Sequence, residues 1–152
     1  MGAIQQLISS FAGATDIYGP ELVTNGGFDS DLSGYFNADY TIAWNSGIVD
    51  FDAPNGGNGF FRTGQVPVDA GSEYLFSFNA KRGTVPSLKY SVWSDGDIIG
   101  PTPYTVGTSD FETFSVQFTV PAGKTWVMLY PVRDIGVAGT AFFDDLSLKE
   151  VL

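Results

Sequence analysis

The chain lacks two residue types that carry much of protein chemistry, cysteine and histidine. Without cysteine there is no disulfide and no thiolate metal site. Without histidine there is no Ser-His-Asp triad, no imidazole general base and no ordinary zinc site. Glycine-rich phosphate loops and nucleophile elbows are missing as well. Together these absences weigh against an enzyme and favour a binding or structural role.

Basic residues are scarce, with seven Lys and Arg against seventeen Asp and Glu, for a net charge of −10. Such a chain repels phosphate backbones, so we expect no nucleic-acid partner. Its carboxylates suit a hard cation instead. No stretch approaches the ~20 apolar residues of a membrane span, and no basic residue precedes the apolar N-terminus, so a secretory signal is not predicted.

Glycine and aromatic residues are abundant: the 152 residues include nineteen glycines, and 15% of them are aromatic. Valine, threonine, phenylalanine and tyrosine fill the segments between turn signals, a mixture typical of an all-β protein. Most predicted strands start about ten residues apart, which favours a jelly-roll β-sandwich of two antiparallel sheets. They cover residues 21–24, 39–44, 47–53, 59–66, 73–81, 87–94, 98–106, 111–119, 125–132 and 140–150.

Apolar residues alternate along several of these strands, which predicts the face that each turns to the core. One such face has Tyr74, Phe76, Phe78 and Ala80, and another has Phe114, Val116, Phe118 and Val120. The stretch WVMLYPV is apolar on both faces. We therefore expect a central strand that is covered on both sides, with Trp126 in the core or a subunit interface.

Residues 1–14 are the one stretch with helical periodicity, because Ile4, Leu7, Ile8 and Phe11 fall at i, i+3, i+4 and i+7. A helix this short is marginal alone. It must dock on its own domain, on a sister subunit or on a larger assembly. We expect an N-terminal arm and linker over residues 1–20 and the sandwich over 21–152.

Four segments carry a family resemblance: LVTNGGFD, VPVDAGSEYLFSFNAK, FETFSVQFTVPAG and AFFDDLSLKEV. In this order they resemble the non-catalytic carbohydrate-binding modules of families 4, 9 and 22, which are galactose-binding-like jelly rolls. The resemblance covers about residues 21–151 and implies the fold more strongly than the function, because such folds carry many roles. The opening GPELVTNGGFDSDLSGY also resembles domains of bacteriophage structural proteins.

The resemblance further implies a structural calcium ion where the first and last segments meet. In that family the segment similar to NGGFD lies beside the segment similar to FFDDLSL. Gly27 and Asp29 would form one side of the site, and Asp144 or Asp145 the other. Calcium takes six to eight oxygen ligands, and neighbouring strand residues face opposite ways, so only one of the last two can face the ion. Alternatively, these acids cap turns without a metal.

Glycan binding would need aromatic rings that stack on sugars and polar groups that bond their hydroxyls. The candidate rings are Tyr35, Tyr40, Trp44, Trp93 and Tyr104, and the candidate amides are Asn37, Asn45, Gln65, Asn79 and Gln117. The alternative for each ring is packing in the core.

Three functions fit these features. The first is a non-catalytic virion surface protein, a capsid decoration or fibre, which would form a homo-oligomer or dock on virion proteins through its arm and grip glycans weakly through avidity. The second is a stand-alone carbohydrate-binding module, secreted or on a cell surface. The third is a small glycan-active enzyme that uses paired acids; the pairs are Asp29 and Asp31, Asp50 and Asp52, and Asp95 and Asp97.

Overall fold

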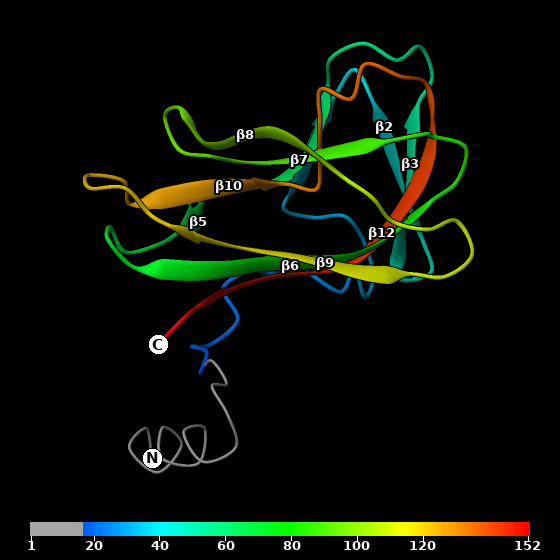
Figure 1. The fold of residues 1–152 in the computed structure, drawn as a ribbon. Coiled ribbons are helices and arrows are strands. Elements are labelled where there is room, and N and C mark those ends of the chain that lie inside the picture. The colour runs from blue at the N-terminus through cyan, green and yellow to red at the C-terminus, as the bar shows by residue number, and fades with distance from the viewer. Residues whose placement is uncertain (1–16) are drawn as a thin grey trace.

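A computed structural model describes residues 17–152, which form two stacked layers of β-strands (Figure 1). The helix predicted over residues 1–14, with Ile4, Leu7, Ile8 and Phe11, lies outside the described residues. Within the described part, no helix is long and apolar enough to cross a bilayer. All strand pairs are antiparallel.

One layer, which we call the lower layer, is a five-stranded sheet in the order β2-β3-β12-β6-β9; in Figure 1 its β6 and β9 run along the bottom, and β12, β3 and β2 rise on the right. Its central strand, β12 (Gly139–Glu150), pairs with β3 and β6 on its two sides. The other strands are β2 (Thr41–Asn45), β3 (Ile48–Ala53), β6 (Glu73–Arg82) and β9 (Glu112–Thr119). The segment nearest the C-terminus therefore lies in the middle of the sheet, where both of its edges are paired.

The upper layer consists of two short sheets, β1-β4-β11 and β5-β10-β7-β8. Its strands are β1 (Tyr35–Ala38), β4 (Phe60–Thr63), β5 (Val66–Pro67), β7 (Leu88–Trp93), β8 (Asp97–Tyr104), β10 (Trp126–Tyr130) and β11 (Val132–Arg133). Only Gly64 and Gln65 separate β4 from β5, and only Pro131 separates β10 from β11. The predicted jelly-roll sandwich is therefore confirmed.

The core between the layers consists largely of aromatic rings. Tyr74, Phe76, Phe78 and Ala80 are all buried, as their alternation predicts. Phe143 of β12 lies at the centre, with ring centroids 5.9 Å from Phe51, 5.6 Å from Phe61 and 6.1 Å from Phe78. Because Phe61 belongs to the upper layer, this cluster joins the two sheets.

The structure corrects the first predicted strand. Residues 21–24 form no strand: the Leu22 N–H donates to the Leu148 carbonyl (2.9 Å), but the Leu148 N–H donates to the Glu21 carboxylate (2.8 Å) and not to a backbone carbonyl. A side chain thus occupies a position that a backbone ladder would use. The first strand is β1, over Tyr35–Ala38, which the sequence analysis did not predict.

Candidate functional site

Several apolar side chains lie on the outer side of the upper layer. On β10, Val127 and Leu129 point into the core, and Trp126, Met128 and Tyr130 belong to the other face, where Trp126 and Met128 are half-buried and Tyr130 is 7% exposed. On β4, Phe61 and Thr63 are buried, which leaves Phe60 and Arg62 outside. The prediction that WVMLYPV is covered on both sides therefore holds for Tyr130 on the outer face, whereas Trp126 and Met128 are only partly covered.

The outward side chains of five strands adjoin one another as a continuous surface. Trp93 and Trp126 have ring centroids 5.6 Å apart, and Phe60 and Tyr130 meet edge to face at 5.7 Å. Arg62 lies over the rings of both Phe60 (5.1 Å) and Phe36 (4.9 Å). We call this surface the aromatic face; it comprises Phe36, Phe60, Arg62, Trp93, Trp126, Met128, Tyr130 and Arg133.

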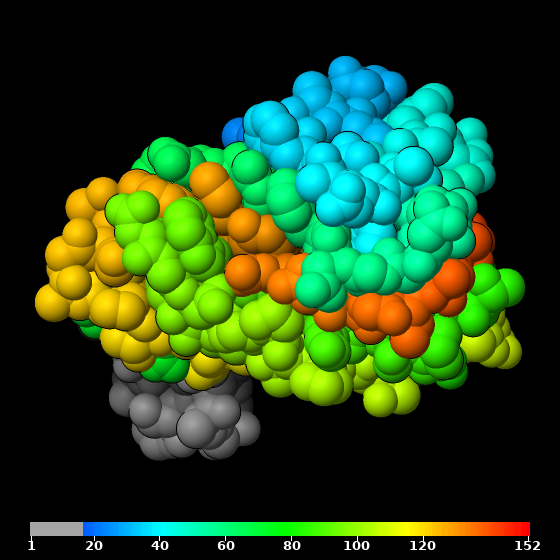
Figure 2. Space-filling model, turned by 90° about the horizontal axis from the view of Figure 1, so that it is seen from above, coloured from blue at the N-terminus to red at the C-terminus, as the bar shows by residue number. Residues whose placement is uncertain are grey.

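Figure 2 looks onto this side of the molecule, with the orange β10–β11 segment between the yellow-green β8 segment and the cyan β1–β2 segment. The strands that form it are held by main-chain pairing, with Met128 opposite Trp93 and Tyr130 opposite Ser91. Side chains on a rigid sheet need little reordering when a ligand binds, which favours recognition.

Polar contacts fix one arginine within the aromatic face. Arg133 forms ion pairs with Asp97 (2.5 Å) and Asp134 (3.6 Å), and it donates to the Ser91 hydroxyl at 3.0 Å. Its guanidinium also lies 5.1 Å from the centre of the Tyr130 ring. Burial raises the pKa of the Tyr130 hydroxyl, although the positive charges of Arg62 and Arg133 act in the opposite direction.

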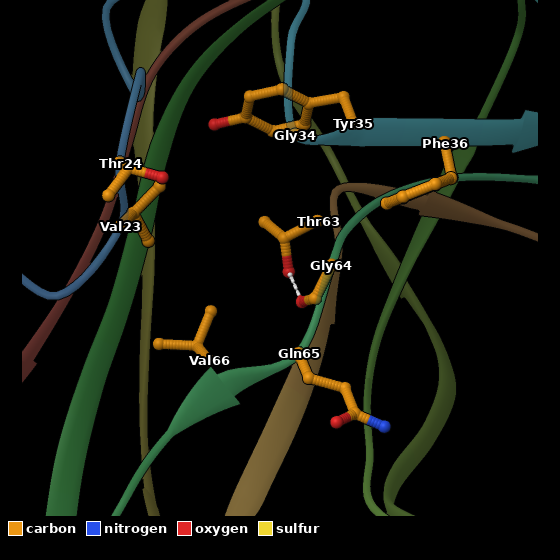
Figure 3. A pocket seen from close by; sticks show the side chains of 9 residues that line it. All are labelled: Val23, Thr24, Gly34, Tyr35, Phe36, Thr63, Gly64, Gln65 and Val66. Atoms are coloured by element: carbon orange, nitrogen blue, oxygen red, sulfur yellow. Dashed lines mark hydrogen bonds between the residues drawn. The ribbon is translucent and has the colours of Figure 1, made fainter.

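A hollow of about 180 Å³ adjoins the Phe36 end of the aromatic face (Figure 3). It lies among Val23, Thr24, Gly34, Tyr35, Phe36, Thr63, Gly64, Gln65 and Val66. The buried Tyr35 hydroxyl has no hydrogen-bond partner among the described residues. Burial first, and then the negative charge of Glu21, raises the pKa of that hydroxyl well above its ordinary value.

The structure separates the five predicted sugar-stacking rings. Trp93 lies on the aromatic face, and Tyr35 lines the adjoining hollow. Tyr40 and Tyr104, by contrast, are core residues, 1% and 7% exposed, so their rings cannot stack on a ligand. Trp44 is 43% exposed, but it belongs to edge strand β2 of the other sheet.

Hydrogen bonds explain why the two buried tyrosines turn inward. The Tyr40 hydroxyl donates to the Gly57 carbonyl at 2.6 Å and accepts the Ile135 N–H at 3.0 Å. The Tyr104 hydroxyl donates to the Pro131 carbonyl at 2.7 Å. Trp44 donates from its indole nitrogen to the Phe28 carbonyl at 2.7 Å, so this tryptophan anchors the turn before β1.

Of the predicted amides, Gln65 is exposed beside the hollow. Asn37 donates to the Tyr40 carbonyl, Asn45 to Asp50 and Asn79 to Asp145, so these amides hold the fold. Gln117 lies on β9 in the other sheet. One of the five amides is thus placed near the aromatic face.

The sequence analysis missed most of the aromatic face, namely Phe36, Phe60, Arg62, Tyr130 and Arg133, and assigned Trp126 to the core or an interface. The sequence does contain a signal for part of this face. In the stretch FFRT, Phe60 and Arg62 alternate with Phe61 and Thr63, so the first two share one side of the strand. The two-sided apolar pattern of WVMLYPV was a second signal. It indicated a fully covered face, whereas Trp126 and Met128 on the outer side of the sandwich are only partly covered.

The segment around Gly27 does lie beside the end of the chain, as the family resemblance implies. The Leu146 N–H donates to the Gly26 carbonyl at 2.9 Å. A Cβ atom on Gly27 would lie 3.3 Å from Oδ1 of Asp29 and 3.9 Å from Oδ1 of Asp145. Glycine therefore leaves room between two carboxylates from opposite ends of the sequence.

Electrostatics fits a cation at this junction, although the geometry supplies few ligands. Burial raises the pKa of the Asp144 carboxyl, and the neighbouring charges of Asp145 and Asp29 raise it further, against the opposing effect of the Asp145 N–H bond. Asp145 has a positive φ of 52° at a β-bulge in β12. Within residues 17–152 no three acids converge as a metal-binding group, so backbone carbonyls would have to complete the ligand set.

The structure gives members of the three acid pairs different surroundings. Asp97 is engaged by Arg133. Asp31 accepts the N–H and hydroxyl of Ser33, and these bonds lower its pKa. Asp50 and Asp52 line a separate hollow of about 290 Å³ on the outside of the lower sheet.

Comparison with known proteins identifies the fold. No family model and no curated protein matches the chain. Among solved structures, the second N-terminal cellulose-binding domain of Cellulomonas fimi β-1,4-glucanase C is similar, with a TM-score of 0.66 and 21% identity over 87% of this chain and 95% of that one. Other carbohydrate-binding modules of families 4 and 22 share the fold.

Two further similarities concern proteins of other kinds. The enzymatically active domain of bacteriophage CBA120 tailspike protein 4 has a TM-score of 0.65 and 15% identity, over 86% of this chain and 21% of that one. A Stig cyclase from Fischerella sp. TAU has a TM-score of 0.65 and 11% identity, over 90% and 98%. At such identities the likeness establishes the fold alone: the chain has the jelly-roll fold of carbohydrate-binding modules.

Proposed function

We propose that the chain is a non-catalytic glycan-binding protein and that the aromatic face is its binding surface. The observation that carries this proposal is the group of rings on the outer side of the upper layer, in which Phe36 is exposed and Phe60, Trp93 and Trp126 are half-buried, while the buried Tyr130 ring packs beside Phe60. Partly exposed apolar side chains that adjoin one another on a sheet indicate a surface for a ligand or partner. Aromatic rings on such a surface can pack against the apolar faces of sugar units.

Binding without catalysis accounts for the polar groups as well. Glycoside hydrolysis needs two carboxyl groups on either side of the scissile bond. Two acids, Asp97 and Asp134, lie beside the aromatic face, and Arg133 engages both carboxylates. The cyclase and this chain have a fold in common, and a common fold does not imply a common reaction.

Affinity gel electrophoresis tests this proposal. Migration of the native protein would be compared in gels with and without soluble β-glucan, xylan, galactomannan or pectin. We expect at least one polysaccharide to retard the wild-type chain, and Trp93→Ala or Trp126→Ala to abolish the retardation. Trp44→Ala, the same change on the other sheet, should leave it intact. Retardation that survives both face variants would place the binding elsewhere.

We further propose that a calcium ion stabilises the junction between the turn at Gly26–Asp29 and the bulge at Asp144–Asp145. The supporting observation is the facing pair of Asp29 and Asp145 on either side of Gly27. Asp29 and Asp145 would supply carboxylate oxygens, and carbonyls of the turn would supply others. The ion would neutralise like charges that come together only in the folded chain.

For the biological setting, we propose a virion surface, where many copies would turn weak glycan affinity into avidity. The likeness in fold to a bacteriophage tailspike domain is what suggests this setting. Light scattering of the full chain and of a variant without residues 1–14 tests it. We expect the full chain to be a discrete oligomer and the shortened one a folded monomer. A full-length monomer that also fails to join virions would contradict the proposal.

A further inference from the structure

Arg62 is a cation that lies on the aromatic face without an acidic partner. Of the acids within residues 17–152, none lies within ion-pair distance of its guanidinium, although the chain is strongly acidic. The guanidinium donates one bond, from Nη1 to the Thr63 carbonyl at 2.8 Å. Its positive charge is therefore not neutralised by the neighbouring protein.

The second arginine of the face shows the opposite arrangement. Arg133 has two carboxylate partners, Asp97 and Asp134, and donates to the Ser91 hydroxyl, which itself donates to the Ile99 carbonyl at 2.7 Å. These bonds fix Arg133 in the fold. The aromatic face consequently has a neutralised arginine near its middle and an unneutralised one toward Phe36.

The surroundings of Arg62 suit an anion. Its guanidinium lies over the rings of Phe36 and Phe60, with 4.9 Å and 5.1 Å to their centroids, and a guanidinium that stacks on rings keeps its N–H edge for other partners. It carries five N–H groups in a planar fork, which matches the oxygens of a carboxylate or sulfate. Phe36 is 49% exposed, so a ligand can reach this position.

The overall charge of −10 does not prevent local attraction. At physiological salt, charges on an exposed surface are screened beyond about 8 Å. The acids nearest the middle of the face, Asp97 and Asp134, are paired with Arg133. An anionic group at Arg62 would thus meet an unpaired cation, while the rest of the glycan contacts uncharged rings.

We propose that Arg62 selects glycans with an anionic substituent, the carboxylate of a uronic acid or a sulfate ester. This inference rests on the proposed function of the aromatic face. The anionic sugar would lie over Phe36, where Gln65 and the adjoining hollow offer polar contacts and space. Neighbouring sugars would lie along the rings toward Trp93 and Trp126.

Isothermal titration with matched polymers tests the inference. The ligands are polygalacturonate and its carboxyl-reduced form, and dextran sulfate and dextran. A charge-assisted hydrogen bond predicts about 10- to 100-fold tighter binding of one charged polymer over its neutral match. The arm that shows the preference identifies carboxylate or sulfate. Arg62→Gln should remove the preference, whereas Lys149→Gln, which changes the net charge equally, should retain it.

Three results would overturn the inference. If Arg62→Gln weakens the binding of charged and neutral polymers equally, Arg62 only holds the Phe36 and Phe60 rings in place and does not recognise the anion. If the wild-type chain binds neutral polysaccharides without preferring either charged form, the inference fails and the proposed glycan function stands. If it binds neither these polymers nor those of the electrophoresis panel, both fail.

Discussion

Trp93 and Trp126 lie on adjacent strands of the upper layer with their ring centroids 5.6 Å apart and their planes at 47°. Neither ring is fully buried, and both are on the outside of the sandwich. Because both rings are partly exposed on the outer side, replacing either one opens no enclosed cavity in the core. Substitutions of these two residues can therefore test binding with little effect on the stability of the fold.

We predict that Trp93→Ala weakens glycan binding at least tenfold and changes the free energy of unfolding by less than about 1.5 kcal/mol, whereas Phe143→Ala lowers it by about 3–5 kcal/mol. Phe143 is fully buried among three rings, and its loss leaves a cavity. Urea unfolding measures both changes. Comparable destabilisation by the two substitutions would show that Trp93 is a core residue.

Gly26 should tolerate no side chain. A Cβ atom there would lie 2.1 Å from the Leu146 carbonyl oxygen, so the turn and β12 would have to separate. We predict that Gly26→Ala lowers the free energy of unfolding by about 3 kcal/mol. Gly19→Ala is the matched control, because its nearest contact would be an ordinary 3.6 Å. Equal urea midpoints for the two variants would contradict the close approach.

Asp144 should make stability depend on pH when no calcium is present. Its pKa is raised in the folded chain, so the folded state binds its proton more tightly than the unfolded state, where the pKa is near 3.8. Stability from this group therefore falls as pH rises from about 3.8 through the folded pKa. In EDTA, Asp144→Asn should be stabilising at pH 7 and lose that advantage near pH 3. An advantage of the same size at both values would contradict the shift.

Calcium should reverse this penalty if it binds between Asp29 and Asp145. At a concentration about 100-fold above the dissociation constant, a bound ion adds about 2.7 kcal/mol, which is a rise in Tm of about 5 °C or more. Asp145→Asn should lose most of the rise, and Asp110→Asn, the same change at an exposed acid outside this junction, should keep it. If calorimetry finds the same Tm in calcium and in EDTA, the calcium proposal is contradicted. Asp29 and Asp145 would then cap turns without a metal.

The sequence predicts the fold well because alternation is a local property. Tyr74, Phe76 and Phe78 share one face of any strand that contains them, and burying that face fixes the register. Segments whose partners are distant in sequence are harder to predict. Residues 21–24 are an example: the Glu21 carboxylate accepts the N–H of Leu148, a residue more than a hundred positions away, and no local pattern shows this contact.

The site was less predictable than the fold, for a physical reason. Apolar residues on both faces of β10 are equally compatible with a covered strand and with a surface that binds a ligand. Tyr104 and Trp93 are both aromatic residues near strand ends, yet hydrogen bonding to Pro131 turns one inward while pairing with Trp126 keeps the other outside. Only the packed structure distinguishes them.

The most direct measurement of the central claim uses tryptophan fluorescence. The chain has three tryptophans, and Trp44→Phe leaves only Trp93 and Trp126, both on the aromatic face. Titration of this variant with the polysaccharide that retards the wild-type chain should give a saturable shift of emission to shorter wavelength, because the ligand excludes water from the rings. Retardation of the variant with no change in emission would contradict binding at this face.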